Sequence, residues 1–175
     1  VSAGEIQCTY DLNGNMISKK SSQETISYVY DPLDRLIQVS TNDKQVDLLY
    51  DPLGRRLTKI VKEKSDSTVT IENYLYDGEN EIGAFNPEGT SKQLKVTGLA
   101  YHKDNPSTIA IELGKQIFAP IQDFQGNVRC LVCLSTGRKI NEYYYNAFGK
   151  NSFINEEVFN PWRYASKRFD EEIRL

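Results

Sequence analysis

Cys130 and Cys133 have the Cys-x-x-Cys spacing of a metal-binding or redox pair. They lie in the apolar run from Val128 to Leu134, which predicts a strand, and residues three apart in a strand face opposite sides. A thioredoxin-type pair needs a helix N-terminus, and a zinc site needs two further ligands. With Cys8 the cysteines number three, too few for a disulfide framework, so their redox state stays open. We therefore expect buried strand cysteines and no metal.

The single histidine, His102, is the other residue that could take part in catalysis or metal binding. It lies in a polar loop beside Lys103-Asp104-Asn105-Pro106, where we expect it to be exposed. The sequence has no Gly-x-Ser-x-Gly, no phosphate-binding loop and no His-rich metal spacing. A Ser-His-Asp triad remains an alternative, because its members meet only in space. We expect no independent enzyme activity and no cofactor.

Composition and charge narrow the classes of function. The chain of 175 residues has 11 Tyr and 7 Phe but one Met and one Trp, a balance that favours strands. A net charge of −3 offers no cationic surface for nucleic acid. No apolar stretch approaches the ~18 residues of a membrane helix. The N-terminus Val-Ser-Ala-Gly carries no export signal. Because residue 1 is Val and not Met, and the last residues end without a turn or tail, we expect the chain to be a piece of a longer protein.

The most regular pattern is a tyrosine followed by an acidic turn. The first three copies begin at residues 10, 30 and 50, and a fourth begins at residue 76. Looser copies occur near residues 123 and 145. The copies read Tyr10-Asp11 with Gly14, Tyr30-Asp31-Pro32-Leu33-Asp34-Arg35-Leu36, Tyr50-Asp51-Pro52-Leu53-Gly54-Arg55-Arg56-Leu57, Tyr76-Asp77-Gly78, Asp123-Phe124-Gln125-Gly126-Asn127 and Tyr145-Asn146-Ala147-Phe148-Gly149-Lys150.

Each residue type in this pattern has a backbone task. Asp at the first turn position can accept hydrogen bonds from amides ahead of it, Pro presets the next φ, and Gly three residues after Asp suits a left-handed conformation. Asp34 stands where Gly is expected, and Asp tolerates positive φ better than most residues. The pattern predicts type I turns that lead into bulged hairpins.

Alternating runs on both sides of the turns predict strands. Tyrosines two apart share one face of a strand, and we expect their rings to pack the inner face of a sheet, with sugar stacking as the alternative. The second half predicts further hairpins, from 107 to 121 and from 128 to 145. The tyrosines of this pattern are Tyr10, Tyr28, Tyr30, Tyr50, Tyr74, Tyr76, Tyr143 and Tyr145.

We therefore expect an all-β fold of repeated antiparallel β-hairpins. Residues 1–90 hold the repeats, with turns near 11–14, 31–34, 51–54 and 77–80. Residues 91–175 continue as a β-meander, with no clean boundary between the two parts.

Tyr-Asp-x-x-Gly-Arg-x-Leu at this spacing resembles the YD repeat of bacterial RHS proteins, of the B and C components of insecticidal toxin complexes, and of teneurins. The stretch from Gln122 to Arg129 is similar to the family's Asp-His-Leu-Gly-Ser-Val-Arg, and the stretch from Tyr145 to Gly149 to its Tyr-Asp-Ala-Phe-Gly. Asn160-Pro161-Trp162-Arg163-Tyr164, followed by Phe169-Asp170-Glu171-Glu172, resembles the opening of the RHS-associated core motif.

The resemblance implies a curved, spiralling YD-repeat sheet, of which this chain is one arc of a hollow shell. Such a shell encloses and helps to deliver a C-terminal polymorphic toxin. The implied partners are the rest of the same polypeptide, the enclosed toxin, and secretion-system or toxin-complex subunits. The implied location is secreted or at the cell surface. Exposed strand edges of the arc would pair with the remainder of the sheet.

In the family, acidic residues of the core motif release the cargo by self-cleavage. Asp170 and Arg163 match motif positions and are the candidates for such a site. Ile173-Arg174-Leu175 replaces the motif's Thr-Gly-Leu, Asn146 replaces the repeat's Asp, and the chain stops before the motif's later Asp. The alternative interpretation of Asp170-Glu171-Glu172 is a solvated acidic turn.

Three functions stay open: a non-catalytic shell segment, an extracellular adhesion or carbohydrate-binding surface, and part of an autoproteolytic core. We favour the shell. It predicts buried rings for Tyr28, Tyr30, Tyr74 and Tyr76, whereas an adhesion surface predicts exposed ones.

Overall fold

The computed structural model describes residues 2–3, 6–98, 107–146, 149 and 151–173, so the predictions for His102 and Phe148 fall outside it. The described residues form an all-β fold, as expected, and contain one short 3-10 helix, η1 (Tyr164–Ser166). Among them no helix is long and apolar enough to cross a bilayer. The strands are β1 (Ser2–Ala3), β2 (Ile6–Tyr10), β3 (Met16–Lys20), β4 (Thr25–Tyr30), β5 (Leu36–Ser40), β6 (Lys44–Tyr50), β7 (Arg56–Glu63), β8 (Val69–Asp77), β9 (Asn80–Phe85), β10 (Ser91–Thr97), β11 (Thr108–Leu113), β12 (Gln116–Gln122), β13 (Val128–Cys133), β14 (Lys139–Tyr145) and β15 (Asn151–Glu156).

The strands of the described residues follow the same order in the sheet as in the chain, from β1 to β15. Short turns join most neighbours, and the registered pairs are antiparallel. This order arises because turn-forming residues recur between successive short strands, which leaves each strand beside its predecessor. The prediction of repeated antiparallel hairpins is confirmed.

The chain divides into two compact units, Val1–Tyr74 and Leu75–Leu175. The division falls within β8, whereas the sequence analysis placed the change from repeats to meander between residues 90 and 91. We describe each unit by itself.

In the first unit, one face of the sheet buries a continuous row of side chains. Tyr28 lies opposite Val39, Val39 opposite Val46, and Val46 opposite Val61, and all four side chains are buried. Tyr74 is buried further along, on β8. We call this side of β4 to β8 the tyrosine face. It follows from the period of two in a strand, which gathers alternate residues on one side.

The opposite face of the first unit carries a polar cluster between three strands. Asp47 accepts hydrogen bonds from Gln38 (2.8 Å), Gln45 (2.8 Å) and Lys62 (2.6 Å). Burial raises the pKa of Asp47, but these three donors outweigh that effect and lower it. The carboxylate therefore links β5, β6 and β7 on the side away from the tyrosine face.

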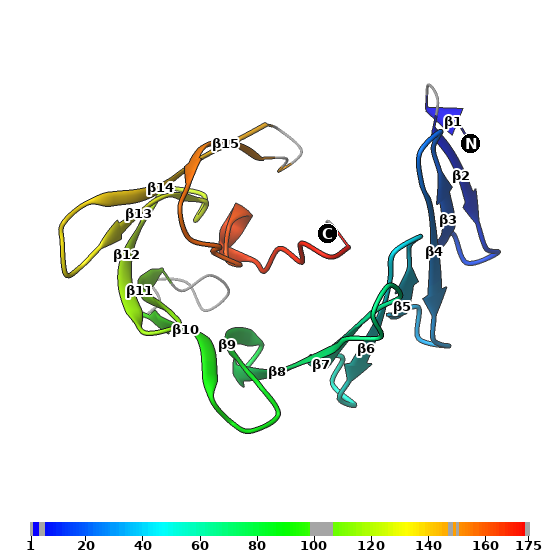
Figure 1. Cartoon of the computed structure of the whole chain (residues 1–175), viewed down its shortest axis with the longest axis horizontal. Coiled ribbons are helices and arrows are strands. Elements are labelled where there is room, and N and C mark those ends of the chain that lie inside the picture. The colour runs from blue at the N-terminus through cyan, green and yellow to red at the C-terminus, as the bar shows by residue number, and fades with distance from the viewer. Residues whose placement is uncertain (1, 4–5, 99–106, 147–148, 150, 174–175) are drawn as a thin grey trace. The chain divides into compact units, whose positions relative to one another are not determined.

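The described residues of the second unit form an apolar core on one face of its sheet. Ile111 lies opposite Phe118, and Phe118 opposite Cys133, across β11 to β13. With Leu131 and Tyr143 they form a buried cluster that Trp162 completes. In Figure 1 the orange and red end of the chain lies within the curl of β9 to β15. We call residues 157–173 the C-terminal segment. We call the face of β11 to β14 that carries Ile111, Phe118, Leu131 and Tyr143 the covered face.

Candidate functional site

The acidic turns share one geometry at four places in the chain. In each, one carboxylate oxygen of the Asp accepts hydrogen bonds from the amides two and four residues later, at 2.8 to 3.0 Å. The Asp amide also donates to the carbonyl four residues later. Burial raises the pKa of each carboxyl group, but the hydrogen bonds outweigh it and lower the pKa. These carboxylates therefore stay ionised and hold the backbone. The four residues are Asp11, Asp31, Asp51 and Asp123.

The third residue after each Asp has a positive φ. Gly54 has φ of 85°, and Asp34 has φ of 58° in the place where other copies have Gly. A register shift precedes each of these turns, because the extra turn residue forms a bulge. Pro32 and Pro52 occupy the position after the Asp. Gly14 and Gly126 also have positive φ.

The turn at Asp77 does not have the predicted geometry, and an Asn turn that was not counted as a copy does have it. Asp77 ends β8, and only Gly78 and Glu79 separate it from β9, so this fourth copy is a two-residue hairpin loop of another kind. The five-residue geometry recurs instead at Asn86, whose side chain accepts from the Thr90 amide at 2.7 Å. The amide side chain of Asn can replace the carboxylate there because it offers the same acceptor oxygen. Gly149, with φ of 75°, lies at the equivalent place after Asn146.

Successive turns of the first unit contact each other. The side-chain amides of Asn13 and Asn15 donate to Asp34 Oδ1 at 2.9 and 2.7 Å. Arg35 donates to the Asp51 carbonyl oxygen at 3.0 Å. Turns that begin twenty residues apart in sequence are thus neighbours along one side of the sheet.

The repeat tyrosines reach back to the preceding hairpin. Tyr30 Oη donates to the Met16 carbonyl oxygen at 3.2 Å, and Tyr50 Oη donates to that of Leu36 at 2.8 Å. Tyr145 makes the same kind of bond to Val128 at 2.8 Å. Each acceptor is the first strand residue after an acidic turn. Tyr28, Tyr74 and Tyr143 are buried, Tyr30, Tyr50, Tyr76 and Tyr145 are partly buried, and Tyr10 is exposed.

A second series of turns was missed in the sequence. Ser21 Oγ accepts from the amides of Gln23 and Glu24, and Thr41 Oγ1 accepts from those of Asp43 and Lys44. These turns join the repeats at the opposite edge and also lie twenty residues apart. The signal was a hydroxyl residue three or four positions before the next strand, which is a common pattern and does not by itself indicate a turn.

The cysteines lie in strands or at their ends. Cys133 is buried on the covered face and Cys130 is partly buried. A hydrogen bond with Ser135 (3.1 Å) is the main cause that lowers the pKa of Cys133 to about 7. Among the described residues no group of His, Cys, Asp and Glu is arranged to hold a metal ion.

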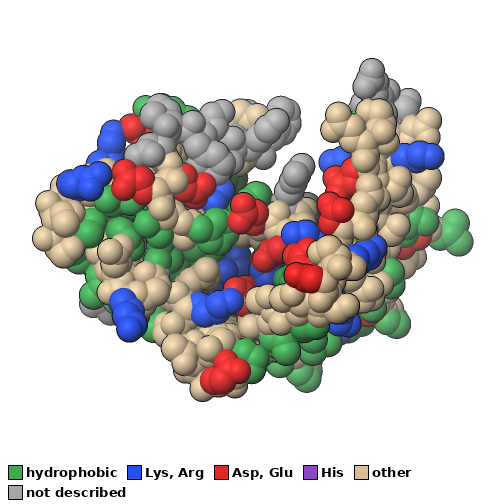
Figure 2. Space-filling model, viewed as in Figure 1, with side chains coloured by type: hydrophobic (Ala, Val, Ile, Leu, Met, Phe, Trp, Pro, Cys, Tyr) green, Lys and Arg blue, Asp and Glu red, His purple; other side chains and the backbone are tan. Residues whose placement is uncertain are grey.

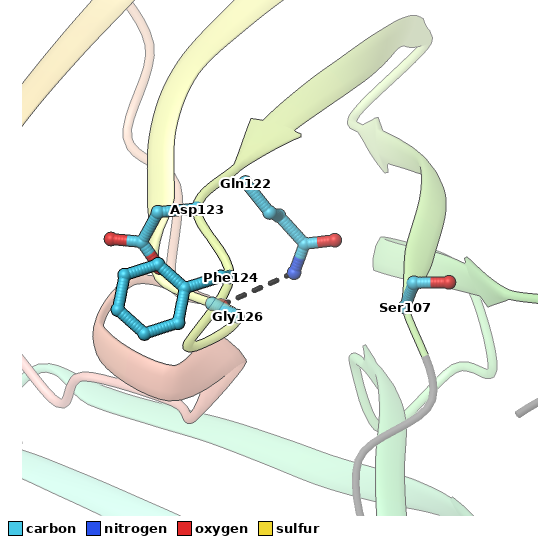
Figure 3. A pocket seen from close by; sticks show the side chains of 5 residues that line it. All are labelled: Ser107, Gln122, Asp123, Phe124 and Gly126. Atoms are coloured by element: carbon cyan, nitrogen blue, oxygen red, sulfur yellow. Dashed lines mark hydrogen bonds between the residues drawn. The ribbon is translucent and has the colours of Figure 1, made fainter. Parts of the chain in front are cut away.

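A shallow pocket of about 400 Å³ lies beside the acidic turn of Asp123. In the view of Figure 3 the Gln122 side chain lies between Phe124 and Ser107, and all three residues line the pocket. The Gln122 side chain has a structural role, because it accepts a hydrogen bond from the Thr108 amide and donates one to the Gly126 carbonyl oxygen. Among the described residues that line the pocket, no nucleophile is paired with a base.

The C-terminal segment binds the covered face through this same turn. The Val128 amide donates to the Arg163 carbonyl oxygen at 3.0 Å. The Ala165 amide donates to Asn127 Oδ1 at 2.7 Å, and Ser166 Oγ donates to the Gly126 carbonyl oxygen at 2.9 Å. An acidic turn of the repeat therefore also holds the end of the chain.

Arg163 is a buried cation within an aromatic surround. Its guanidinium carbon lies 4.7 Å from the ring centre of Phe169, 5.1 Å from Phe159 and 5.8 Å from Tyr143. Its charge is paired with Glu156 at 2.8 Å. Burial raises the pKa of Glu156, an effect that the Arg163 charge opposes. This arrangement fixes where the segment leaves β15.

A second charged cluster surrounds the indole of Trp162. Arg168 makes a two-bond ion pair with Glu81, with both distances 2.9 Å, and Trp162 Nε1 donates to Glu81 at 3.3 Å. The cations of Arg168 and Lys95 lie 5.3 and 5.4 Å from the indole ring centre. Sequence reasoning missed this cluster because its members are far apart in the chain.

Asp170 is 5% exposed, so the interpretation of a solvated acidic turn is wrong for this residue. Ile173 is also buried, and its amide donates to the Asp170 carbonyl oxygen, which turns the chain inward. Glu171 is exposed, as a solvated turn predicts. Arg163 has Glu156 as an ion-pair partner, and its guanidinium packs on the ring of Phe169, the neighbour of Asp170.

Comparison with solved structures supports the architecture. The chain is similar to a crystal structure of TcdB2-TccC3 and to one of TcdB2-TccC3 without its hypervariable C-terminal region, with TM-scores of 0.56 and 0.55. Sequence identity is 16% in both cases, and the matches cover 94% of this chain but only 11% of the other. No protein-family model matches the sequence, and no curated protein matches it. The likeness is therefore one of fold.

Proposed function

We propose that this chain is a structural segment of an RHS or YD-repeat shell, which encloses a polypeptide that follows it in a longer protein. The observation that carries the proposal is the continuous series of hairpins, in which Asp, Asn, Arg and Tyr side chains form hydrogen bonds between one hairpin and the next. The Asp residues of the four acidic turns hold the backbone, and Tyr30, Tyr50 and Tyr145 bind the preceding hairpin. Such a sheet is suited to form a wall.

The burial of the repeat tyrosines supports a wall more than an adhesion surface. Tyr28 and Tyr74 are buried, and Tyr30 and Tyr76 are partly buried. Rings that stack on sugars need an open face, and these rings pack against neighbouring strands instead. The fold likeness to TcdB2-TccC3, a protein that has a hypervariable C-terminal region, agrees with a cargo located C-terminal to the wall.

The proposal predicts protection of the downstream polypeptide from protease. We expect that in the native protein, with its downstream sequence, trypsin leaves this polypeptide intact while it cleaves the same polypeptide expressed alone. Denaturant that unfolds the repeats should abolish the protection. Equal digestion rates in the two forms would exclude enclosure.

A further inference from the structure

The side of the second unit's sheet that lies opposite the covered face carries exposed aliphatic side chains. Val96 of β10 is 58% exposed, and Ile117 and Ile121 of β12 are 50% and 52% exposed. Figure 2 shows hydrophobic side chains gathered over the part of the molecule that holds β11 to β14 in Figure 1. Aliphatic groups that adjoin one another on an exposed surface are typical of a site where another molecule binds.

The strand register makes this surface continuous. Ile117 and Ala119 flank Phe118, whose ring belongs to the core of the covered face, so both lie on the other side of β12. On that side Ala119 lies opposite Val132 of β13. We call this side of β10 to β14 the aliphatic face. Its apolar residues include Val96, Ile117, Ala119, Ile121, Cys130 and Val132.

Opposite charges flank the aliphatic face at one end of its strands. Glu112 on β11 lies opposite Ile117, and Lys139 on β14 lies opposite Val132. Each is close to a turn, at 114–115 or at 134–138, and both turns lie at the same end of the sheet. Lys139 forms an ion pair with Glu142 of its own strand at 2.6 Å, but its side chain is still 54% exposed. Its amine can therefore meet a second carboxylate.

We propose that two copies of this chain associate through their aliphatic faces, related by a two-fold axis that runs between β12 and β13, parallel to the strands. Such an axis places β12 of one copy over β13 of the other at the same level. Residues that are neighbours within the sheet then meet again between the copies. Ala119 lies against the partner's Val132, and Ile121 lies against the partner's Cys130. In each pair a smaller side chain faces a larger one, which allows close packing.

Charge complementarity favours a second copy over other occupants. The same axis places β11 of one copy over β14 of the other, so Glu112 lies near the partner's Lys139. This contact occurs twice, because the arrangement is symmetric. A lipid surface or an uncharged peptide would give neither residue a counterpart of opposite charge.

The area of the aliphatic face indicates a weak, reversible dimer. Five strands about 4.8 Å apart, with six residues at a rise of about 3.4 Å each, give a face of roughly 500 Å² on each copy. The total of about 1,000 Å² is at the lower limit for a specific interface between proteins. Association therefore depends on protein concentration. It does not depend on the proposed enclosing function.

The test is analytical ultracentrifugation of the complete chain over a hundredfold range of concentration. We expect the average mass to rise from that of one chain towards that of two. Ile121→Lys places a cation in the apolar contact, so it should weaken association at least tenfold. The matched control is Leu33→Lys, which changes an exposed aliphatic residue of the first unit and should have no effect. Circular dichroism checks that both variants are folded.

Two charge variants test the symmetry. Glu112→Lys and Lys139→Glu each bring like charges together in their own dimers, so each should associate about fivefold more weakly than the unchanged chain. An equimolar mixture of the two variants should recover the loss, because a mixed dimer pairs opposite charges at both contacts. A mixture that associates no better than its components would exclude this two-fold arrangement.

Other outcomes would overturn the dimer. Association that survives Ile121→Lys would show that the copies meet elsewhere, for example at strand edges. A chain that stays monomeric but binds phosphatidylcholine vesicles, and loses this binding in Ile121→Lys, would assign the aliphatic face to a lipid surface. A monomeric native longer protein that Ile121→Lys makes less stable would assign the face to another part of the same polypeptide.

Discussion

Replacing Trp162 with alanine is expected to lower the free energy of unfolding of the second unit by about 3–5 kcal/mol. The side chain is fully buried and joins the C-terminal segment to the cluster of Ile111, Phe118 and Leu131. Its loss leaves a cavity on the covered face and removes a donor to Glu81. Because Trp162 is the single tryptophan of the chain, denaturation should be followed by circular dichroism.

The matched control is Phe124→Ala, another loss of an aromatic ring in the same unit. Phe124 is 97% exposed at the tip of an acidic turn, so its replacement should change stability by less than about 0.5 kcal/mol. If both variants lost the same small amount, the segment would not be packed on the sheet as described.

Arg163→Met is expected to cost about 2–4 kcal/mol, because it leaves the Glu156 carboxylate in a largely buried place without its ion-pair partner. Methionine keeps much of the apolar contact with Phe159 and Phe169, so lost packing contributes little. The estimate lies below that for a fully buried pair, since the side chain of Glu156 is 21% exposed. Urea denaturation at pH 7 measures the loss.

The cause can be separated from general damage by a second substitution. Glu156→Gln removes the charge that Arg163→Met leaves unpaired, so the double variant should be more stable than Arg163→Met alone. The penalty should also shrink as the pH falls and Glu156, whose pKa is raised by burial, becomes protonated. Additive losses that do not change with pH would argue against the ion pair.

Local backbone chemistry is what the sequence reveals most directly in this chain. The Asp, Pro and Gly positions act within five residues of one another, so the turn at Asp51 can be anticipated without knowledge of its surroundings. The same reasoning is weaker where a different residue offers the same hydrogen bond, as at Asn86. It also treated Asp77-Gly78 as a further copy, although glycine directly after Asp forms a shorter loop.

The C-terminal segment could not be placed from the sequence, because its contacts join distant residues. Glu81 and Arg168 are 87 positions apart, and neither has a distinctive neighbour pattern. The resemblance to the core motif drew attention to Asp170 and Arg163, but not to the aromatic rings around the Arg163 guanidinium. Burial of Asp170 likewise depends on how Ile173 packs, which no local pattern encodes.

Enclosure by the sheet is tested most directly by photo-crosslinking from two adjacent positions of β4 in the native longer protein. Ile26 shares the side of Tyr28, the tyrosine face, and Ser27 lies on the opposite side of the strand. With a benzophenone amino acid at each position in turn, we predict crosslinks to the downstream polypeptide from position 26 and none from position 27. Equal crosslinking from both positions, or crosslinks from position 27 alone, would contradict the account.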